Sequence, residues 1–225
     1  MKQVRKIIAL LIAVCLVVGC SSQAFAASGT TEIFFFNYQG SVGEGGTAQI
    51  KSSLNSLGYT TNRYVNVHAY YVRRTMNEDK VFAIVSHGAP GRVVCKDGST
   101  TMSASAVNSD NNNYSLAAWF NSGALSGMKF AYYGACQTAR TSATYGNLLT
   151  YTTGTLGASC ALGFYDSVSS AKATYYEGKL FQYLASGYTV ARANNMAQVA
   201  TYNAYGSYGA VDSAQITGNS NTRIN

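Results

Sequence analysis

Short apolar runs and amphipathic stretches alternate along most of the chain. Apolar and β-branched runs predict strands at residues 33–38, 64–69, 81–86, 129–133, 159–165 and 214–217. Helical spacing of apolar residues predicts helices carrying the stripes Ile50, Leu54 and Leu57; Leu116 and Phe120; Tyr176, Leu180 and Leu184; and Val190, Ala193, Ala197 and Ala200. Several strands are apolar on both faces, which is typical of a parallel sheet covered on both sides. We therefore expect a three-layer α/β/α fold with a mostly parallel sheet of about six strands.

Two connections interrupt this alternation. Residues 91–102 place two β-branched segments around a Lys-Asp-Gly-Ser turn, which predicts a hairpin. Residues 105–113 are rich in Asn, Ser and Asp. We interpret them as a solvated loop, with oxygen ligands for calcium as the alternative.

The first 26 residues have the pattern of an export signal. Three cations lie in residues 1–6, an apolar run too short to span a bilayer covers 7–19, and Ala24-Phe25-Ala26 offers a cleavage site. The expected product is a secreted or cell-surface protein with one domain over 27–225 and no integral membrane span. A lipoprotein signal, with Cys20 lipidated and retained, is the less favoured alternative.

Composition excludes several classes of protein. Of the 225 residues, 47% are hydrophobic, 11% are charged and one is proline, so the chain is neither disordered nor collagen-like. Three of its 16 Lys and Arg lie in the signal, so the formal net charge of +7 falls to +4 after cleavage. The remaining cations are scattered, and we expect no nucleic-acid partner.

Cysteine and histidine are few. Cys95, Cys136 and Cys160 remain beyond the signal, an odd number that leaves at least one thiol outside a disulfide. His68 and His87 are the two histidines, and no Cys-x-x-Cys pair exists, so a structural zinc site lacks ligands at usable spacing. We expect no cofactor.

Two buried strands run directly into chemically reactive residues. The apolar run at 81–85 leads into Ser86-His87-Gly88, and the run at 129–133 leads into Gly134-Ala135-Cys136. Neighbouring strands lie roughly 4.8 Å apart, so a His and a Cys that end adjacent parallel strands meet at one edge of the sheet. An imidazole beside a thiol makes the sulfur a nucleophile toward a carbonyl carbon at neutral pH.

The order of the two residues narrows the kind of enzyme. A papain-like site needs a histidine after the cysteine, and an α/β-hydrolase needs nucleophile, acid and then histidine, but no histidine follows Cys136. Here His87 precedes Cys136 by 49 residues, close to the spacing of about 50 in caspases.

On these motifs the sequence resembles the caspase-like superfamily of cysteine peptidases, which includes caspases, gingipains, clostripain, separase and bacterial CHAT domains. His87-Gly88, Ala135-Cys136, the hairpin after His-Gly and the helix end at 181–187 are similar to the CHAT and gingipain pattern, over about residues 32–218. Gly134 stands where caspases have Gln and Thr138 where they have Gly. Arginines of an aspartate pocket are not recognisable.

The resemblance implies a caspase-like fold and a peptidase that acts on proteins or peptides. It implies that Cys136 is the nucleophile, that His87 is the general acid and base, and that the backbone N–H groups of Gly88 and Cys136 form the oxyanion hole. A catalytically inactive surface-binding domain, and a thiol amidase or acyl-transferase, are the alternative functions.

Asp166 is the predicted specificity residue. It follows the strand at 159–165 and so ends at the expected edge of the sheet, where a carboxylate would bind Arg or Lys of a substrate. A helix N-cap is the alternative role of Asp166. Tyr165 and Tyr133 either line the same pocket or pack in the core.

Overall fold

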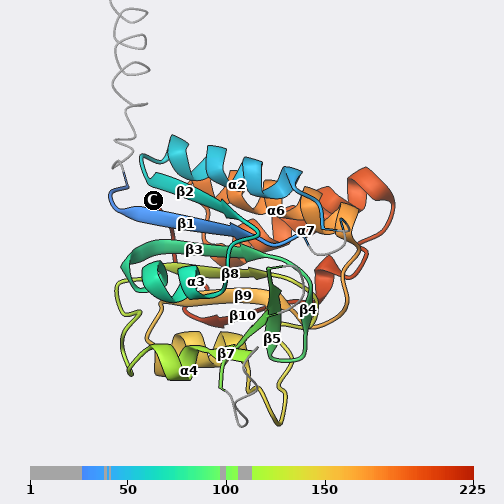
Figure 1. Ribbon diagram of the computed structural model, residues 1–225. Helices are drawn as coiled ribbons and strands as arrows, with labels where there is room; N and C mark the ends of the chain where they lie inside the picture. The colour runs from blue at the N-terminus through green and yellow to red at the C-terminus, as the bar shows by residue number, and fades with distance from the viewer. Residues whose placement is uncertain (1–26, 38–39, 41, 97–99, 106–112) are drawn as a thin grey trace, which may run out of the picture.

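A six-stranded sheet forms the centre of the computed structural model, which describes residues 27–37, 40, 42–96, 100–105 and 113–225 (Figure 1). The predicted export signal at 1–26, most of the loop at 105–113 and the hairpin turn at 97–99 lie outside the described residues. In chain order the strands of this sheet are β1 (Thr30–Phe35), β2 (Thr60–Val65), β3 (Asp79–Val85), β8 (Phe130–Gly134), β9 (Cys160–Phe164) and β10 (Ala214–Gly218).

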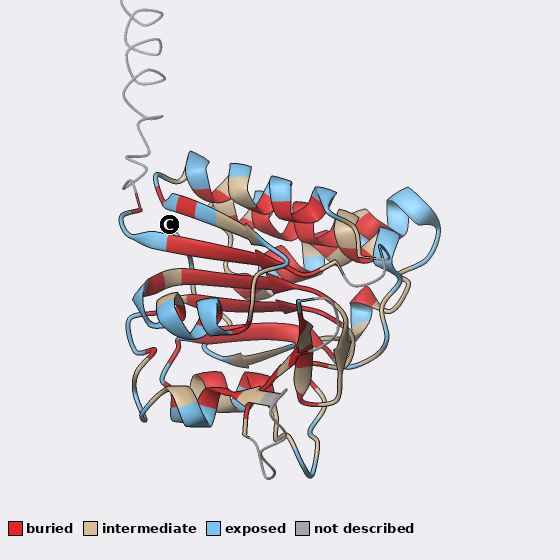
Figure 2. Cartoon of the chain, viewed as in Figure 1, coloured by how far each residue is buried: buried red, intermediate tan, exposed pale blue. Residues whose placement is uncertain are grey.

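The spatial order is β10-β9-β8-β3-β1-β2, and only β10 runs antiparallel to its neighbour. Alternate residues of each central strand face opposite sides, so both faces of the strand must be apolar to be buried. This requirement is met in β1, β3 and β8, which are buried along almost their whole length (Figure 2). The expectation of a mostly parallel sheet covered on both sides is therefore confirmed.

Three long helices cover one face of the sheet (Figure 1). They are α2 (Gly45–Ser56), α6 (Ser170–Ala185) and α7 (Val190–Tyr205). Their apolar stripes form one core with strand residues such as Ile33, Val81 and Leu162.

Shorter elements cover the opposite face, where Phe34, Phe82 and Tyr133 point into a second core. The helical elements there are α3 (Tyr70–Thr75), η2 (Met76–Glu78), α4 (Leu116–Trp119), α5 (Leu148–Thr150) and η3 (Tyr151–Thr155). A four-stranded sheet packs beside them, with β4 (Gly88–Ala89), β5 (Arg92–Cys95), β6 (Thr100–Ser103) and β7 (Asn113–Ser115) in that order. Its β5–β6 pair is the predicted hairpin.

Two predicted strands are displaced along the chain. The run at 33–38 predicts a strand that begins three residues later than β1, which occupies Thr30–Phe35, because the first three residues of β1 are polar. The run at 64–69 predicts a strand, whereas β2 occupies Thr60–Val65 and the chain then turns into α3. β2 is the edge strand, and three of its residues are exposed, so it needs no continuous apolar run. Ala69, at the end of the run, is buried under the sheet as the N-cap of α3.

No helix within the described part of the chain combines the length and the apolar character that crossing a membrane requires.

Candidate active site

His87 and Cys136 follow two neighbouring parallel strands at matched positions. Val85 of β3 pairs with Gly134 of β8, and each of the two residues stands two places beyond its member of that pair. The Ser86 N–H extends the ladder by donating to the Gly134 carbonyl at 3.2 Å. Both side chains are half-buried, and both line one cavity of about 50 Å³. The structure thus brings the predicted pair together.

The backbones that carry the pair are in close contact. A Cβ atom at Gly88 would lie 2.3 Å from the Cys136 carbonyl oxygen and 3.1 Å from the Cys136 nitrogen. Contacts this short exclude any side chain at position 88. Glycine is therefore required after His87 for the two strand ends to approach each other.

Two backbone N–H groups are directed away from the protein's own hydrogen-bond ladders. In the described turn the Cys136 N–H forms no hydrogen bond. Gly88 opposes Val93 in β4–β5, and the Val94 N–H donates to the His87 carbonyl at the preceding position. Because bonded and non-bonded pairs alternate in an antiparallel ladder, the Gly88 N–H points away from β5. Neither N–H group is thus used by the β4–β5 ladder or by the described turn.

A sharp turn fixes the sulfur of Cys136. Gln137, the next residue, has a left-handed φ of 59°, and its N–H donates to the Asp166 carbonyl at 3.2 Å. The Val168 N–H donates to Cys136 Sγ at 3.3 Å. Sγ also lies 3.9 Å from the Val168 carbonyl oxygen, so the backbone of Val168 positions the sulfur through both its N–H and its carbonyl group. Left-handed non-glycine residues are frequent at active sites, where the surrounding contacts hold them in place.

Thr138 explains one of the departures from the caspase pattern. Its hydroxyl contacts the carbonyls of Tyr133 and Ala135, both at 3.1 Å, and accepts the Phe164 N–H at 3.3 Å. The side chain is fully buried between β8 and β9. It links the end of the cysteine strand to the next strand, a role that glycine cannot perform.

Helix α6 supplies the wall opposite the two strand ends. Ser170, Ala173, Thr174 and Glu177 all line the cavity, and their spacing puts them on one face of the helix. Glu177 is 1% exposed, and its Oε1 accepts a hydrogen bond from the Tyr132 hydroxyl at 3.2 Å. Burial raises the pKa of Glu177 to about 8.

Glu177 is a candidate functional residue that the sequence patterns above do not include. A signal was available, since Ala173, Glu177, Leu180 and Leu184 follow helical spacing and put one carboxyl group inside an otherwise apolar stripe. An acid at this position of the helix is buried when the apolar stripe packs on the sheet. Buried acids are rare in general and are frequent at functional sites.

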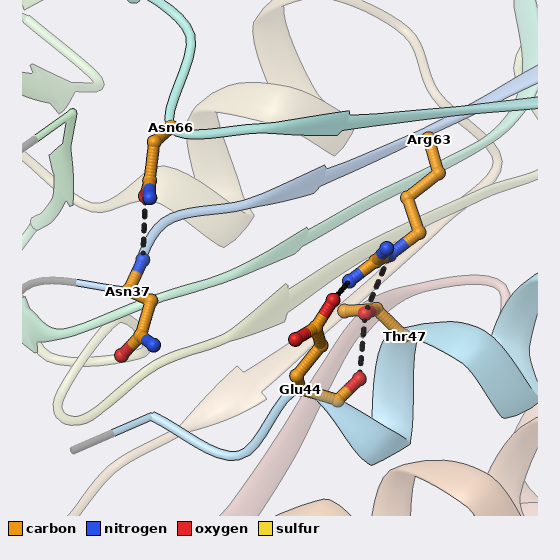
Figure 3. Close-up of polar contacts among 5 residues, drawn as sticks. All are labelled: Asn37, Glu44, Thr47, Arg63 and Asn66. Atoms are coloured by element: carbon orange, nitrogen blue, oxygen red, sulfur yellow. Dashed lines mark hydrogen bonds and ion pairs between the residues drawn. The ribbon is translucent and has the colours of Figure 1, made fainter. Parts of the chain in front are cut away.

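The first turn of α2 and the loop before it are tied to the edge of the sheet (Figure 3). The Arg63 guanidinium contacts Glu44 and donates from Nε to Thr47 Oγ1 at 2.9 Å. The Asn37 N–H donates to the Asn66 side-chain oxygen at 2.9 Å, and Asn37 in turn accepts from the Val42 N–H. Val42 lines the cavity, so these contacts position its outer wall.

Comparison of the structure with solved structures identifies the architecture. Caspase-1 from Spodoptera frugiperda matches with a TM-score of 0.51 and 12% sequence identity, over 85% of this chain and 87% of that chain. The fold is caspase-like. A scan against protein-family models gives no match, and a search of curated protein sequences gives none either.

The caspase-like fold places Asp166 outside the cavity. Its carboxylate lies 2.9 Å from the Arg140 guanidinium, and the pair is partly exposed to solvent. The same guanidinium lies over the Tyr165 ring, 4.6 Å from its centroid. Ser169 is the N-cap of α6, so Asp166 does not cap that helix.

Tyr133 packs in the core. It is fully buried on the sheet face opposite α6, and its hydroxyl bonds Thr152 Oγ1 at 2.6 Å. Neither Tyr133 nor Tyr165 is among the residues that line the cavity. The structure thus gives Tyr133 the packing role and leaves Tyr165 beside Arg140.

The remaining cysteines and histidine lie elsewhere in the caspase-like fold. Cys95 and Cys160 are buried and unpaired; burial raises the pKa of both thiols, that of Cys160 to about 12. His68 accepts the Tyr70 N–H at 3.1 Å and contacts the Tyr114 hydroxyl at 3.2 Å. Among the described residues no cluster of three or more His, Cys, Asp or Glu could hold a metal ion.

Proposed function

We propose that this chain is a secreted cysteine endopeptidase that hydrolyses peptide bonds through His87 and Cys136, after Lys or Arg. One observation carries the proposal: the side chains of His87 and Cys136 line the same cavity, just beyond the paired ends of β3 and β8. The backbone at Gly88 also lies against the backbone of Cys136. The caspase-like fold supports a peptidase of this class.

Acylation begins with the sulfur. His87 accepts the thiol proton, and the Cys136 thiolate attacks the scissile carbonyl carbon, forming a C–S bond while the carbonyl π electrons move to oxygen. The N–H groups of Gly88 and Cys136 bind that oxyanion. When the intermediate collapses the C–N bond breaks, His87 donates its proton to the leaving amine, and a thioester remains on Cys136.

Deacylation uses water. His87 removes a proton from the water as its oxygen attacks the thioester carbonyl, and the same two N–H groups bind the second oxyanion. The C–S bond then breaks, which releases the carboxylic acid product. The proton that His87 took from the water returns to the sulfur, which the Val168 N–H holds in place at 3.3 Å.

The charge of the cavity motivates the specificity. No Lys or Arg is among the described residues that line it, and a pocket for aspartate would need such a cation. One carboxyl group, that of Glu177, is among the residues that line the cavity. A carboxyl group there favours a cationic side chain before the scissile bond.

Cleavage of a peptide library by the purified protein, read by mass spectrometry, tests the proposal. We expect Cys136→Ala and His87→Ala each to abolish cleavage, and the matched variant His68→Ala to retain it, because His68 lies outside the cavity. Turnover of small amides without peptide cleavage would identify an amidase instead. A wild-type protein that cleaves neither, with Cys136 inert to electrophiles, would contradict the proposal and favour a surface-binding domain.

A further inference from the structure

One residue that lines the cavity beside Cys136, Glu177, has a carboxyl oxygen with no partner. Oε1 of Glu177 accepts from Tyr132, whereas Oε2 is buried and has no hydrogen-bond partner among the described residues. The ion pairs of the described chain join Arg63 to Glu44 and Arg140 to Asp166, so neither arginine neutralises Glu177. Burying an acid without a hydrogen-bond partner lowers the stability of a protein. Such a residue therefore calls for an explanation other than stability, and a role in binding is one.

Two glycines leave room around this carboxyl group. A Cβ atom at Gly46 would lie 2.3 Å from Glu177 Oε2, and one at Gly134 would lie 2.8 Å from Oε1. The clamp of Arg63 on Glu44 and Thr47 holds the first turn of α2 against this position (Figure 3). The absence of side chains at both glycines therefore preserves the space that Glu177 occupies.

The carboxyl group is within reach of a side chain held at the nucleophile. Gly134, which Glu177 touches, precedes Cys136 by two residues, so the two Cα atoms are at most about 7 Å apart. The walls of the cavity between them include Val42, Val85 and Val168. An aliphatic stem would contact these valines, while a polar tip would meet the acid.

We propose that Glu177 is the specificity residue of the site and that its free Oε2 binds the ammonium group of a lysine side chain before the scissile bond. This inference rests on the proposed peptidase function and names its preferred substrate.

The geometry favours lysine over arginine. Because Oε1 is engaged by Tyr132, the carboxylate presents one oxygen, which suits the point charge of an ammonium better than the two-pronged fork of a guanidinium. The cavity is also small. It has a volume of about 50 Å³, and one water needs roughly 10–15 Å³, so it has more room for the few atoms of an ammonium group than for a branched guanidinium.

The protonation of the empty site is consistent with this role. Because burial raises the pKa of Glu177 to about 8, the group is largely neutral at pH 7 when no cation is present. An entering ammonium favours the carboxylate, whose proton leaves to solvent.

Peptidyl electrophiles that alkylate Cys136 test the inference. Matched probes would carry lysine, arginine, norleucine or aspartate next to the reactive group, norleucine being the neutral analogue of lysine. The rate of adduct formation at Cys136 is followed by mass spectrometry. We expect lysine to react about 10- to 100-fold faster than norleucine, and faster than arginine.

Variants then assign the preference. Glu177→Gln should lower the ratio of the lysine rate to the norleucine rate toward 1, Glu177→Asp should retain part of it, and the control Asp166→Asn should keep the wild-type ratio. Should Glu177→Gln fail to fold, the ratio in Glu177→Asp decides the matter: an unchanged ratio there would overturn the inference.

The possible failures are distinguishable. If no probe labels Cys136 in the wild type, the peptidase function itself is wrong. If probes label Cys136 but norleucine matches lysine, or if Glu177→Gln keeps the preference for lysine, Glu177 is a structural acid and the inference is overturned. If Asp166→Asn loses the preference for lysine and Glu177→Gln keeps it, Asp166 is the specificity residue.

Discussion

Gly88 and Cys136 are in such close contact that one added methyl group at Gly88 would lie 2.3 Å from the Cys136 carbonyl oxygen. The contact joins the His-Gly and Ala-Cys motifs directly, although neither motif is distinctive by itself. It makes residue 88 a sensitive position for activity.

Gly88→Ala should lower peptidase activity by at least about 100-fold, because the methyl group must displace the backbone that carries the nucleophile. The measurement is kcat/KM on a cleaved peptide, together with the thermal midpoint. Gly154→Ala is the matched control, since nothing lies within 4 Å of a Cβ atom at Gly154. Full activity in Gly88→Ala would show that the contact does not position the site.

Cys136 should be the one cysteine of the folded mature protein that iodoacetamide labels rapidly. Its side chain is half-buried and opens to the cavity, whereas Cys95 and Cys160 are buried and their thiols have raised pKa values. Mass mapping of the adducts measures this. Equal labelling of all three cysteines, or none at Cys136, would remove the nucleophile from the proposed mechanism.

Stability should fall as the pH rises, and Asp79 should contribute to the fall. Asp79 is 2% exposed, neither carboxyl oxygen has a partner among the described residues, and burial with the nearby charge of Glu32 raises its pKa to about 9. The folded protein thus holds a proton that the unfolded chain releases near pH 4. The stabilisation is complete below about pH 4 and is lost as the pH rises toward 9.

Asp79→Asn should remove this loss. Its free energy of unfolding relative to wild type should increase from pH 5 to pH 9, by about one to a few kcal/mol, in urea titrations at several pH values. Asp212→Asn, at an exposed position, is the control and should show no such trend. A constant difference between Asp79→Asn and wild type would mean that Asp79 is ionised in the folded protein.

The exported protein should begin at Ala27. Residues 24–26 have the small residues of a cleavage site. The Ala27 nitrogen donates to the Leu57 carbonyl at 2.8 Å, a contact that a new amino terminus can keep. Intact-mass measurement of the secreted product checks this. A lipidated product beginning at Cys20 would instead identify a lipoprotein.

Most of the central sheet was predictable because its strands are buried on both faces. Such strands are continuous apolar runs, so β3, β8 and β9 were found within a residue or two of their ends, and the adjacency of β8 and β9 followed from chain order. The edge strand β2 was misplaced because its exposed residues carry no apolar signal. The four-stranded side sheet was predicted only as its β5–β6 hairpin, since β4 and β7 are two and three residues long.

Some residues of the candidate site were predictable from the sequence and others were not, for similar reasons. His87 and Cys136 were predictable because each directly follows a strand that could be located. The partner of Asp166 was not, because Arg140 comes from a different turn and only the packed fold brings the two charges together. Glu177 was missed because the apolar stripe of its helix was assigned to Tyr176, Leu180 and Leu184, which left the acid beside the stripe and not within it.

His87 and Cys136 are 49 residues apart, and the pairing of β3 with β8 alone brings them together. A slip of one residue in that pairing would turn every side chain of one strand to the opposite face and separate the proposed nucleophile from its base. Hydrolytic capacity would therefore arise only when folding of the sheet is complete. A nascent or translocating chain would be harmless to its own cell, because it would contain both reactive residues without the ladder that joins them.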